Sequence, residues 1–267
     1  EDTNKVKLLN EISTNYKCID KLKSIEFARQ AYHLSDKIDY NRGLISSSLL
    51  LGSGYNRLGE PAISKDFYFK AIDISQKIND QFMLAKVYNR LISYYGGIQD
   101  FNRASEYAFK AREIFEKTGN KREISGVFIN IAYVYAQQGN YKKAKAYNFK
   151  ALNIAYELND HSLLALIYNN LGAVYSNIQN IDSSNIYLKI AADFYSSAED
   201  YEGMCYVYYN IGENFFKSGK QNEAYKNFHK GIQLSKSVNS WELIATGYQV
   251  LANYHYDVNN YDSAEYY

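Results

Sequence analysis

Apolar residues recur at steps of three and four along almost the whole chain, which is the spacing of one face of an α-helix. The stretch 168–180, YNNLGAVYSNIQN, shows this pattern, since Leu171, Val174, Tyr175 and Ile178 follow that spacing. Asparagine is a mediocre helix former and glycine a poor one, so local propensity alone would favour a loop here. We therefore expect a helix in which Gly172 is kept for close packing.

The pattern returns every 40 residues, with no insertion or deletion from residue 41 to residue 267. One column of the repeat is mostly small, and a column of large rings follows it three residues later. The small column holds Gly52, Ile92, Ala132, Gly172, Gly212 and Ala252, and the ring column holds Tyr55, Tyr95, Tyr135, Tyr175, Phe215 and His255. Small side chains let two helices cross closely, while the rings fill the space beside the crossing.

Polar turns divide each repeat into two helices. We expect the turns inside the repeats at residues 59–60, 99–100, 139–140, 179–180, 219–220 and 259–260. The turns between repeats carry Asp80, Asn120, Asp160, Asp200 and Ser240, which are good N-cap residues for the helix that follows. Pro61, the single proline, falls at the first position of a helix, where its missing N–H costs nothing.

This register predicts an all-α protein with one domain over residues 1–267. The repeats are 1–40, 41–80, 81–120, 121–160, 161–200, 201–240 and a partial repeat 241–267, and residues 1–40 fit with one residue missing. Repeat arrays normally end in a polar capping helix, whereas this sequence stops within the second helix of a repeat. We therefore expect the chain to be a fragment of a longer protein.

The strings Leu171-Gly172-x-x-Tyr175 with Ser184 and Ala191, and Ile131-Ala132-x-x-Tyr135 with Ala144 and Ala151, resemble the tetratricopeptide repeat. The resemblance implies a right-handed superhelical solenoid of helix-turn-helix units, about six and a half in number here, whose first helices line a concave groove. The repeats differ from the usual ones, which have about 34 residues, a proline after the second helix and a tryptophan in the first. The six additional residues would lengthen the helices.

The charge balance argues against nucleic-acid or membrane-surface binding by this region. Formal net charge is +1, with 30 basic and 29 acidic residues spread evenly, and no apolar run is long enough to span a bilayer. A groove for nucleic acid or a polybasic membrane patch would show as a basic cluster.

The chain also lacks the spacings that catalytic, metal or cofactor sites need. Cys18 and Cys205 lie five repeats apart, too far for a disulfide, and are expected to be buried apolar residues. His33, His161, His229 and His255 occupy four different repeat positions with no metal-ligand spacing. The glycines of LGSGYNRLG at 51–59 do not match a phosphate-binding loop. We expect neither an enzyme nor a cofactor.

One row of side chains on the first helices is not required by packing. The residue before the Leu or Ile of each repeat is Arg90, Asn130, Asn170 and Asn210 in four consecutive repeats, and Asn89 and Asn169 lie one position earlier. An asparagine amide can bond both the C=O and the N–H of a peptide unit, so this ladder could hold an extended peptide. Arg90 could also bind a carboxylate, such as a peptide C-terminus.

Flanking side chains would then supply specificity. The register turns Lys86, Tyr133, Tyr206, Tyr209, Glu213 and Phe216 toward the same groove. The expected peptide-binding residues are Asn89, Arg90, Asn130, Asn169, Asn170, Asn210, Tyr133, Tyr209 and Lys86. Two alternatives remain open. In the first, the asparagines bind no ligand: they lie on a solvated helix face, or they bond the adjacent repeat and stiffen the stack. In the second, the groove binds another kind of ligand.

Two kinds of parent protein fit a peptide- or protein-binding module. The opening residues Asp2-Thr3-x-Lys5-Val6-x-Leu8-Leu9-Asn10-x-Ile12, followed by Tyr/Asn-rich repeats, resemble the start of bacterial membrane-anchored signalling regulators. That resemblance implies a sensing region on the periplasmic face, with a membrane span and a histidine-kinase or DNA-binding module beyond residue 267. The alternative is a cytoplasmic scaffold that assembles a multiprotein complex without signalling output.

Overall fold

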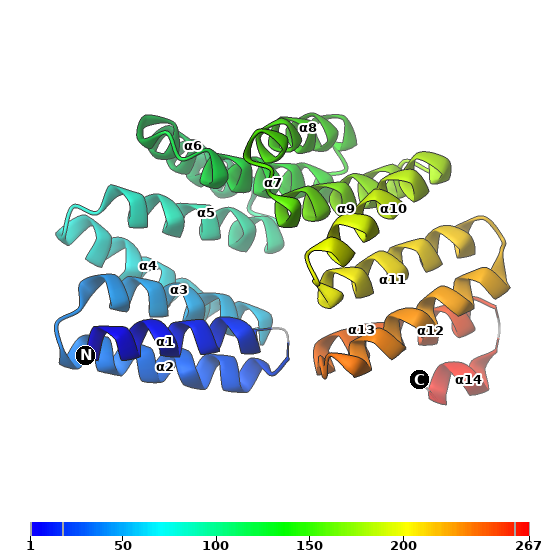
Figure 1. The fold of residues 1–267 in the computed structure, drawn as a ribbon, viewed down its shortest axis with the longest axis horizontal. Coiled ribbons are helices and arrows are strands. Elements are labelled where there is room, and N and C mark those ends of the chain that lie inside the picture. Colours follow the sequence, from blue (N-terminus) through cyan, green and yellow to red (C-terminus); the bar gives the residue numbers. More distant parts are fainter. Residues whose placement is uncertain (1, 18, 259, 267) are drawn as a thin grey trace. The chain divides into compact units, whose positions relative to one another are not determined.

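The chain folds into α-helices joined by short turns (Figure 1). A computed structural model describes residues 2–17, 19–258 and 260–266, which form fourteen helices and no strand. The helices are α1 (Asp2–Tyr16), α2 (Lys21–Lys37), α3 (Asn41–Arg57), α4 (Pro61–Lys77), α5 (Gln81–Gly97), α6 (Phe101–Thr118), α7 (Lys121–Gln137), α8 (Tyr141–Leu158), α9 (His161–Asn177), α10 (Ile181–Ser197), α11 (Tyr201–Lys217), α12 (Gln221–Ser237), α13 (Trp241–Asp257) and α14 (Tyr261–Tyr266).

The turns lie where the repeat predicts them. Within the repeats the chain reverses at a residue with left-handed backbone, which is glycine at Gly59 and Gly139 (φ 79° and 70°) but glutamine at Gln179 (φ 60°). Between repeats, the side chains of Asp80, Asn120, Asp160 and Asp200 accept the predicted N-cap hydrogen bonds. Ser240 occupies the N-cap position of α13 as predicted, but its side chain makes no cap hydrogen bond there.

The chain divides into two compact units, residues 1–140 and 141–267. In the first unit α1–α2, α3–α4 and α5–α6 pack as consecutive pairs, and α1, α3, α5 and α7 also contact one another in that order. In the second unit α9–α10, α11–α12 and α13–α14 form the pairs, and α9, α11 and α13 contact one another in order. That all 267 residues form one solenoid domain stays a prediction from the register.

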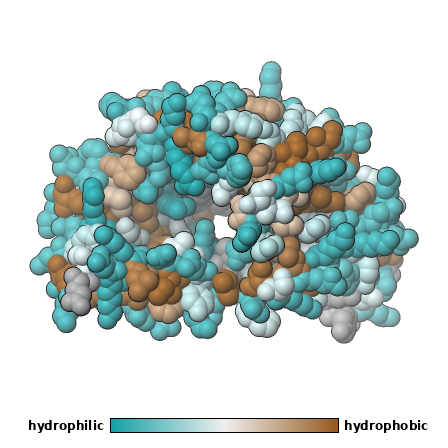
Figure 2. All heavy atoms as spheres, viewed as in Figure 1, coloured by the Kyte–Doolittle hydropathy of each residue, from teal (hydrophilic) through white to brown (hydrophobic). Residues whose placement is uncertain are grey.

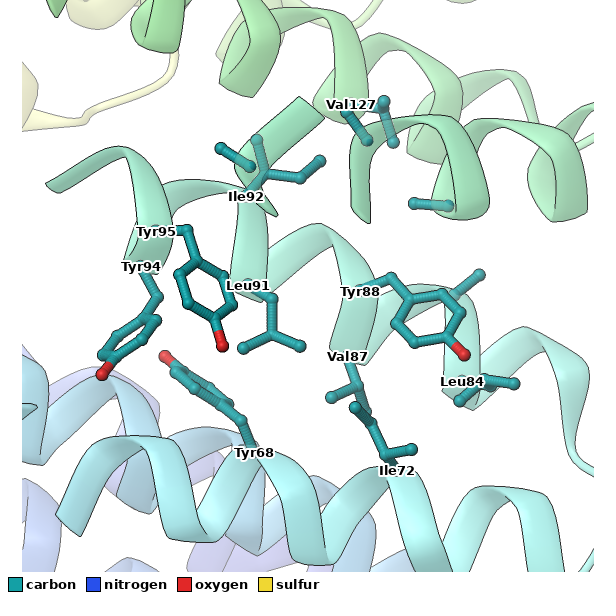
Figure 3. Close-up of a cluster of buried hydrophobic side chains, with 14 of the residues drawn as sticks. Tyr68, Ile72, Leu84, Val87, Tyr88, Leu91, Ile92, Tyr94, Tyr95 and Val127 are labelled. Atoms are coloured by element: carbon teal, nitrogen blue, oxygen red, sulfur yellow. The ribbon is translucent and has the colours of Figure 1, made fainter. Parts of the chain in front are cut away.

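A continuous apolar core runs through α3–α7 in the first unit (Figure 3). Tyr68, Tyr94 and Tyr95 meet there edge to face, with ring centroids 5.9 Å apart for Tyr68–Tyr94 and 5.0 Å for Tyr94–Tyr95. Tyr68 also packs on Gly52, where a Cβ atom would lie 2.6 Å from its ring. The small column of the repeat therefore makes room for large side chains from the paired helix, as predicted.

Gly172 likewise makes room for a large side chain of the paired helix in the second unit. A Cβ atom on Gly172 would lie 2.6 Å from Cγ of Leu188, which is fully buried on the paired helix α10. Ser184 Oγ donates a 2.7 Å hydrogen bond to the Gly172 carbonyl, which shows how closely α9 and α10 approach. The absence of a side chain at Gly172 thus allows α9 and α10 to lie in close contact.

The cysteine prediction can be tested at one of its two positions. Cys205 is buried in the core of the second unit, as expected, whereas Cys18 lies outside the described residues. In the part of the chain that the structure describes, no helix has both the length and the apolar character to cross a membrane. Hydrophilic residues dominate the face shown in Figure 2, with hydrophobic residues in smaller patches between them.

Candidate functional site

The predicted asparagine row contains a hydrogen-bonded pair in the first unit. Asn130 Nδ2 on α7 donates to Asn89 Oδ1 on α5 over 2.8 Å and to the Asn89 carbonyl over 3.3 Å. Ser93 Oγ donates to Asn130 Oδ1 over 3.1 Å. Both ends of the Asn130 amide are therefore engaged inside the protein. The Nδ2 group of Asn89 makes no hydrogen bond within the described chain, so its two N–H donors can serve a ligand.

The second unit repeats this arrangement. Asn210 Nδ2 on α11 donates to Asn169 Oδ1 on α9 over 3.0 Å, and the same two helices are joined by a 2.9 Å bond from Lys217 Nζ to Ser176 Oγ. Asn170 lies half-buried beside Asn169, and its side chain makes no hydrogen bond to the described residues of its unit. Asparagines of consecutive repeats thus brace one another, which was one of the alternatives for this row.

An open groove of about 460 Å³ lies on the first-helix side of the first unit. It is formed by α1, α3, α5 and the start of α7, and Asn89, Arg90 and Lys86 all line it. Asn10, Thr14, Ser46 and Ser53 add hydroxyl and amide groups to its wall, and Leu49, Leu50 and Met83 add apolar side chains. The groove has the polar, donor-rich character that binding to a peptide backbone requires.

Charge in this groove is mostly balanced. Lys86 Nζ forms a 3.3 Å ion pair with Glu123 Oε1 on α7, and the groove also contains Glu11 and Arg122. Arg90 is exposed at the edge of the groove and takes part in no ion pair among the described residues. Burial raises the pKa of the neighbouring Tyr68 phenol, while its hydrogen bond with Ser53 and the positive charge of Arg90 act in the opposite direction.

A smaller cavity of about 100 Å³ adjoins the groove and shares Thr14, Leu50, Ser53 and Arg90 with it. The rest of its wall comes from the turn between α1 and α2, the first turn of α2 and the last turn of α3. Its other charged residues are Lys17, Lys21 and Arg57. Repeat columns could not identify these three, because two lie in the irregular first repeat and one at a helix end.

Comparison with known proteins shows which proteins share this fold. Residues 123–201 match the family model of the tetratricopeptide repeat. Together with the solved structures, this match shows that the chain has the helical-repeat fold of tetratricopeptide-type proteins. The prediction of an all-α fold of this type is confirmed. No curated protein sequence matches the chain.

Three solved structures illustrate the likeness. The Rap conjugation gene regulator of plasmid pLS20, in complex with the Phr* peptide, is 18% identical with a TM-score of 0.72, covering 98% of this chain and 82% of that one. NprR in complex with its cognate peptide NprX is 16% identical with a TM-score of 0.69, covering 94% and 75%. A STAND protein with a tetratricopeptide repeat sensor from Pyrococcus horikoshii is 20% identical with a TM-score of 0.62, covering 98% and 42%. At these identities the likeness shows a shared fold.

One predicted groove residue of this repeat protein lies elsewhere. Tyr209 is 3% exposed, and its hydroxyl donates a 2.9 Å hydrogen bond to the Leu243 carbonyl on α13. Burial raises its pKa to about 12. The prediction that Tyr209 faces a groove is wrong, because Gly231 and Gly247 leave space into which its ring packs.

The other flanking residues are accessible to differing degrees. Tyr133 and Tyr206 are 41% and 40% exposed, and Glu213 is exposed as well. Phe216 is half-buried with its ring edge-on to Tyr254 at 5.4 Å. No group of three or more His, Cys, Asp or Glu side chains suited to a metal ion occurs in the described ranges.

Proposed function

We propose that the chain is a non-catalytic module that binds an extended peptide or protein segment. The observation that carries this proposal is the groove of the first unit, in which the free amide donors of Asn89 lie beside Arg90 and Lys86. Two similar folds were solved with peptides bound, the Rap regulator with Phr* and NprR with NprX. We also propose a sensing role in a bacterial signalling regulator, which the likeness to these two regulators supports, and a cytoplasmic scaffold without signalling output is the alternative.

The asparagines divide into two roles in this proposal. Asn89 in the first unit and Asn169 in the second each offer their Nδ2 donors to carbonyl groups of a segment bound on their own unit. Asn130 and Asn210 hold these amides in place by donating hydrogen bonds to their Oδ1 atoms. Asn130 and Asn210 therefore act as positioning residues. Because a pre-oriented donor loses less entropy on binding, each pair favours recognition of backbone carbonyls. Gly126 on α7 leaves one side of Asn89 Nδ2 uncovered, because a Cβ atom at this position would contact Nδ2 at 3.5 Å.

The remaining predicted residues would contact the ligand in different ways. Arg90 supplies a positive charge at the edge of the groove, and Lys86 contributes a charge already shared with Glu123. Tyr133 and Asn170 are accessible and would extend the contact surface of their own units. Tyrosine gives a large contact area at low entropic cost.

Replacement of Asn89 by aspartate separates binding from stability. Asn89→Asp keeps an oxygen that can accept from Asn130 Nδ2 but removes both amide donors. Peptides selected from a random library on the unmodified chain should bind this variant about tenfold more weakly, the effect of one lost hydrogen bond next to a new charge. Asn102→Asp, the same change at an exposed position on α6, should bind them normally.

The melting temperature completes the experiment. Asn89→Asp should melt within a few degrees of the unmodified chain, since the pair with Asn130 is retained. Undiminished peptide binding by a folded Asn89→Asp variant would overturn the role of this groove. Selection of whole partner proteins but no short peptides would favour the scaffold alternative.

A further inference from the structure

Two charged side chains of the first-unit groove take part in no ion pair among the described residues. They are Glu11 on α1 and Arg90 on α5, which both line the groove and are both exposed. Lys86 and Glu123, in contrast, neutralise each other across 3.3 Å at the α7 side of the groove. The fifth charged group, Arg122, lines the groove from the start of α7. Glu11 and Arg90 therefore keep their charges available to a ligand.

Glu11 and Arg90 occupy the same row of the repeat, with Leu50 between them. The three residues are 39 and 40 positions apart, which are the lengths of the short first repeat and of one full repeat. Their helices α1, α3 and α5 contact one another in that order (Figure 1). The row therefore presents an acidic, an apolar and a basic side chain across three consecutive first helices.

The middle of this row offers apolar contact. Leu50 is half-buried, and Leu49 from α3 and Met83 from α5 line the groove with it. Leu49 and Met83 also pack against the core of the first unit, which holds them in place. A methionine adapts its shape to the side chain that it contacts. An aliphatic side chain of a bound segment would therefore find apolar partners between the two charges.

Helix packing sets the distance between the two charges. Contacting helices lie about 8–10 Å apart, so α1 and α5, with α3 between them, are separated by roughly 16–20 Å. An extended chain advances about 3.3 Å per residue, so about five or six residues cover that distance.

The geometry points to a ligand that carries both charges: an extended segment with an acidic side chain on Arg90, an aliphatic side chain over Leu50 and a basic side chain on Glu11. The inference rests on the proposed function and adds the class of segment and its direction across the helices. Because the two charges of the groove are fixed, a segment bound in the reverse direction would bring like charges together, which lowers affinity.

Selection of a random peptide library on the unmodified chain tests the pattern. The selected peptides should share an acidic and a basic residue about five or six positions apart, always in the same order, with an aliphatic residue between them. For one such peptide, Arg90→Gln should weaken binding by about fivefold, the upper range for one partly exposed ion pair. Replacement of the peptide's acidic residue by its amide should have the same effect, and the two changes together should cost little more than either alone. Glu11→Gln should be coupled in the same way to the basic residue.

Charge reversal gives the sharpest readout. Arg90→Glu should select peptides with basic residues at both positions, and Glu11→Lys should select peptides with acidic residues at both. Lys77→Glu and Asp73→Lys make the matching changes of charge at exposed positions of α4 outside the groove, and these variants should select the original pattern. All four variants should melt within a few degrees of the unmodified chain, because the replaced side chains are exposed.

The outcomes separate this inference from the proposed function. If the unmodified chain selects no peptide, the proposed function is overturned and this inference with it. If peptides bind and Asn89→Asp weakens them, but Arg90→Glu and Glu11→Lys select the same charge pattern as the unmodified chain, only the inference is overturned. A pattern that changes equally in Lys77→Glu or Asp73→Lys would also overturn it, because net charge and not the groove would then decide the selection.

Discussion

Asn210 on α11 donates a 3.0 Å hydrogen bond from its side-chain amide to Oδ1 of Asn169 on α9. The two residues lie 41 positions apart, one repeat and one residue, and Asn130 and Asn89 form the same pair in the first unit. The asparagine row therefore contains bonded pairs that join consecutive repeats. In each pair the side-chain amide of one asparagine donates to the side-chain oxygen of the other. The acceptor therefore keeps its own N–H groups for a ligand.

We predict a measurable coupling between Asn210 and Asn169. Asn210→Ala and Asn169→Ala should each lower the free energy of unfolding by about 1 kcal/mol, the typical net contribution of one hydrogen bond. The double variant should cost less than the sum, because both single changes remove the same bond. Urea unfolding of the four proteins measures this coupling.

Asn177→Ala provides the matched control for this cycle. Asn177 is exposed at the end of α9 and should show no coupling with Asn210. Additive effects of Asn210→Ala and Asn169→Ala would show that the bond contributes nothing to stability, and the brace would then be unnecessary to the stack.

We predict opposite effects of Gly→Ala at two helical glycines. At Gly212 an added Cβ would lie 2.3 Å from the Phe228 ring, which is 1% exposed, so Gly212→Ala should destabilise by about 1–3 kcal/mol through overpacking. At Gly97, the last residue of α5, an added Cβ would meet no atom within 4 Å beyond its own turn of helix, and Gly97→Ala should stabilise by about 0.5 kcal/mol, the lower end of the range for helix propensity. Thermal melting of both variants checks the contrast, and a stabilised Gly212→Ala would contradict the packing role.

The repeat made most of the fold predictable. Columns of small and large residues at a constant 40-residue step identify helix pairs, because neighbouring repeats must solve the same packing problem. The turns and the five N-cap positions between repeats followed from the same register, and four of the five residues make a side-chain cap bond. Ser240 is the N-cap residue of α13 but makes no side-chain cap bond, because a good capping residue type does not guarantee the bond.

The site was less predictable, because it depends on departures from the repeat. Tyr209 occupies a position that the register turned toward the groove, yet its ring is buried where Gly231 replaces the alanine of the other repeats. Gly231 and Gly247, which lack side chains, were the signal in the sequence that a large residue packs against them. The cationic cavity draws on Lys17 and Lys21 of the irregular first repeat, so no column could reveal it.

We predict that the Tyr209 hydroxyl contributes to stability. Tyr209→Phe preserves the ring between Gly231 and Gly247 but removes the 2.9 Å hydrogen bond to the Leu243 carbonyl. The free energy of unfolding should fall by about 0.5–1.5 kcal/mol. Tyr201→Phe, at a 47% exposed tyrosine of the same helix, should change it little. Denaturant unfolding measures both, and equal effects would contradict an internal role for the Tyr209 hydroxyl.

We predict that the Cys205 thiol is unreactive while the second unit is folded. Burial first, and then the negative charges of Glu202 and Asp200, raise the pKa of this thiol to about 12 from an ordinary value of 9.0. Only the thiolate reacts with disulfide reagents, so its fraction at mildly alkaline pH is about a thousandfold below that of an exposed cysteine. In a Cys18→Ala background, labelling with an aromatic disulfide should be slow until denaturant is added.

The same shift predicts a pH dependence of stability. Below about pH 9 the thiol is protonated in both states and its contribution is fully present; between about 9 and about 12 the unfolded chain releases the proton while the folded chain retains it. The free energy of unfolding should therefore fall as pH rises through this window. Cys205→Ala should lose less stability over the same range, and the difference between the two proteins isolates the thiol from the titrating tyrosines. Rapid labelling of the folded chain, or identical pH profiles for the two proteins, would contradict the raised pKa.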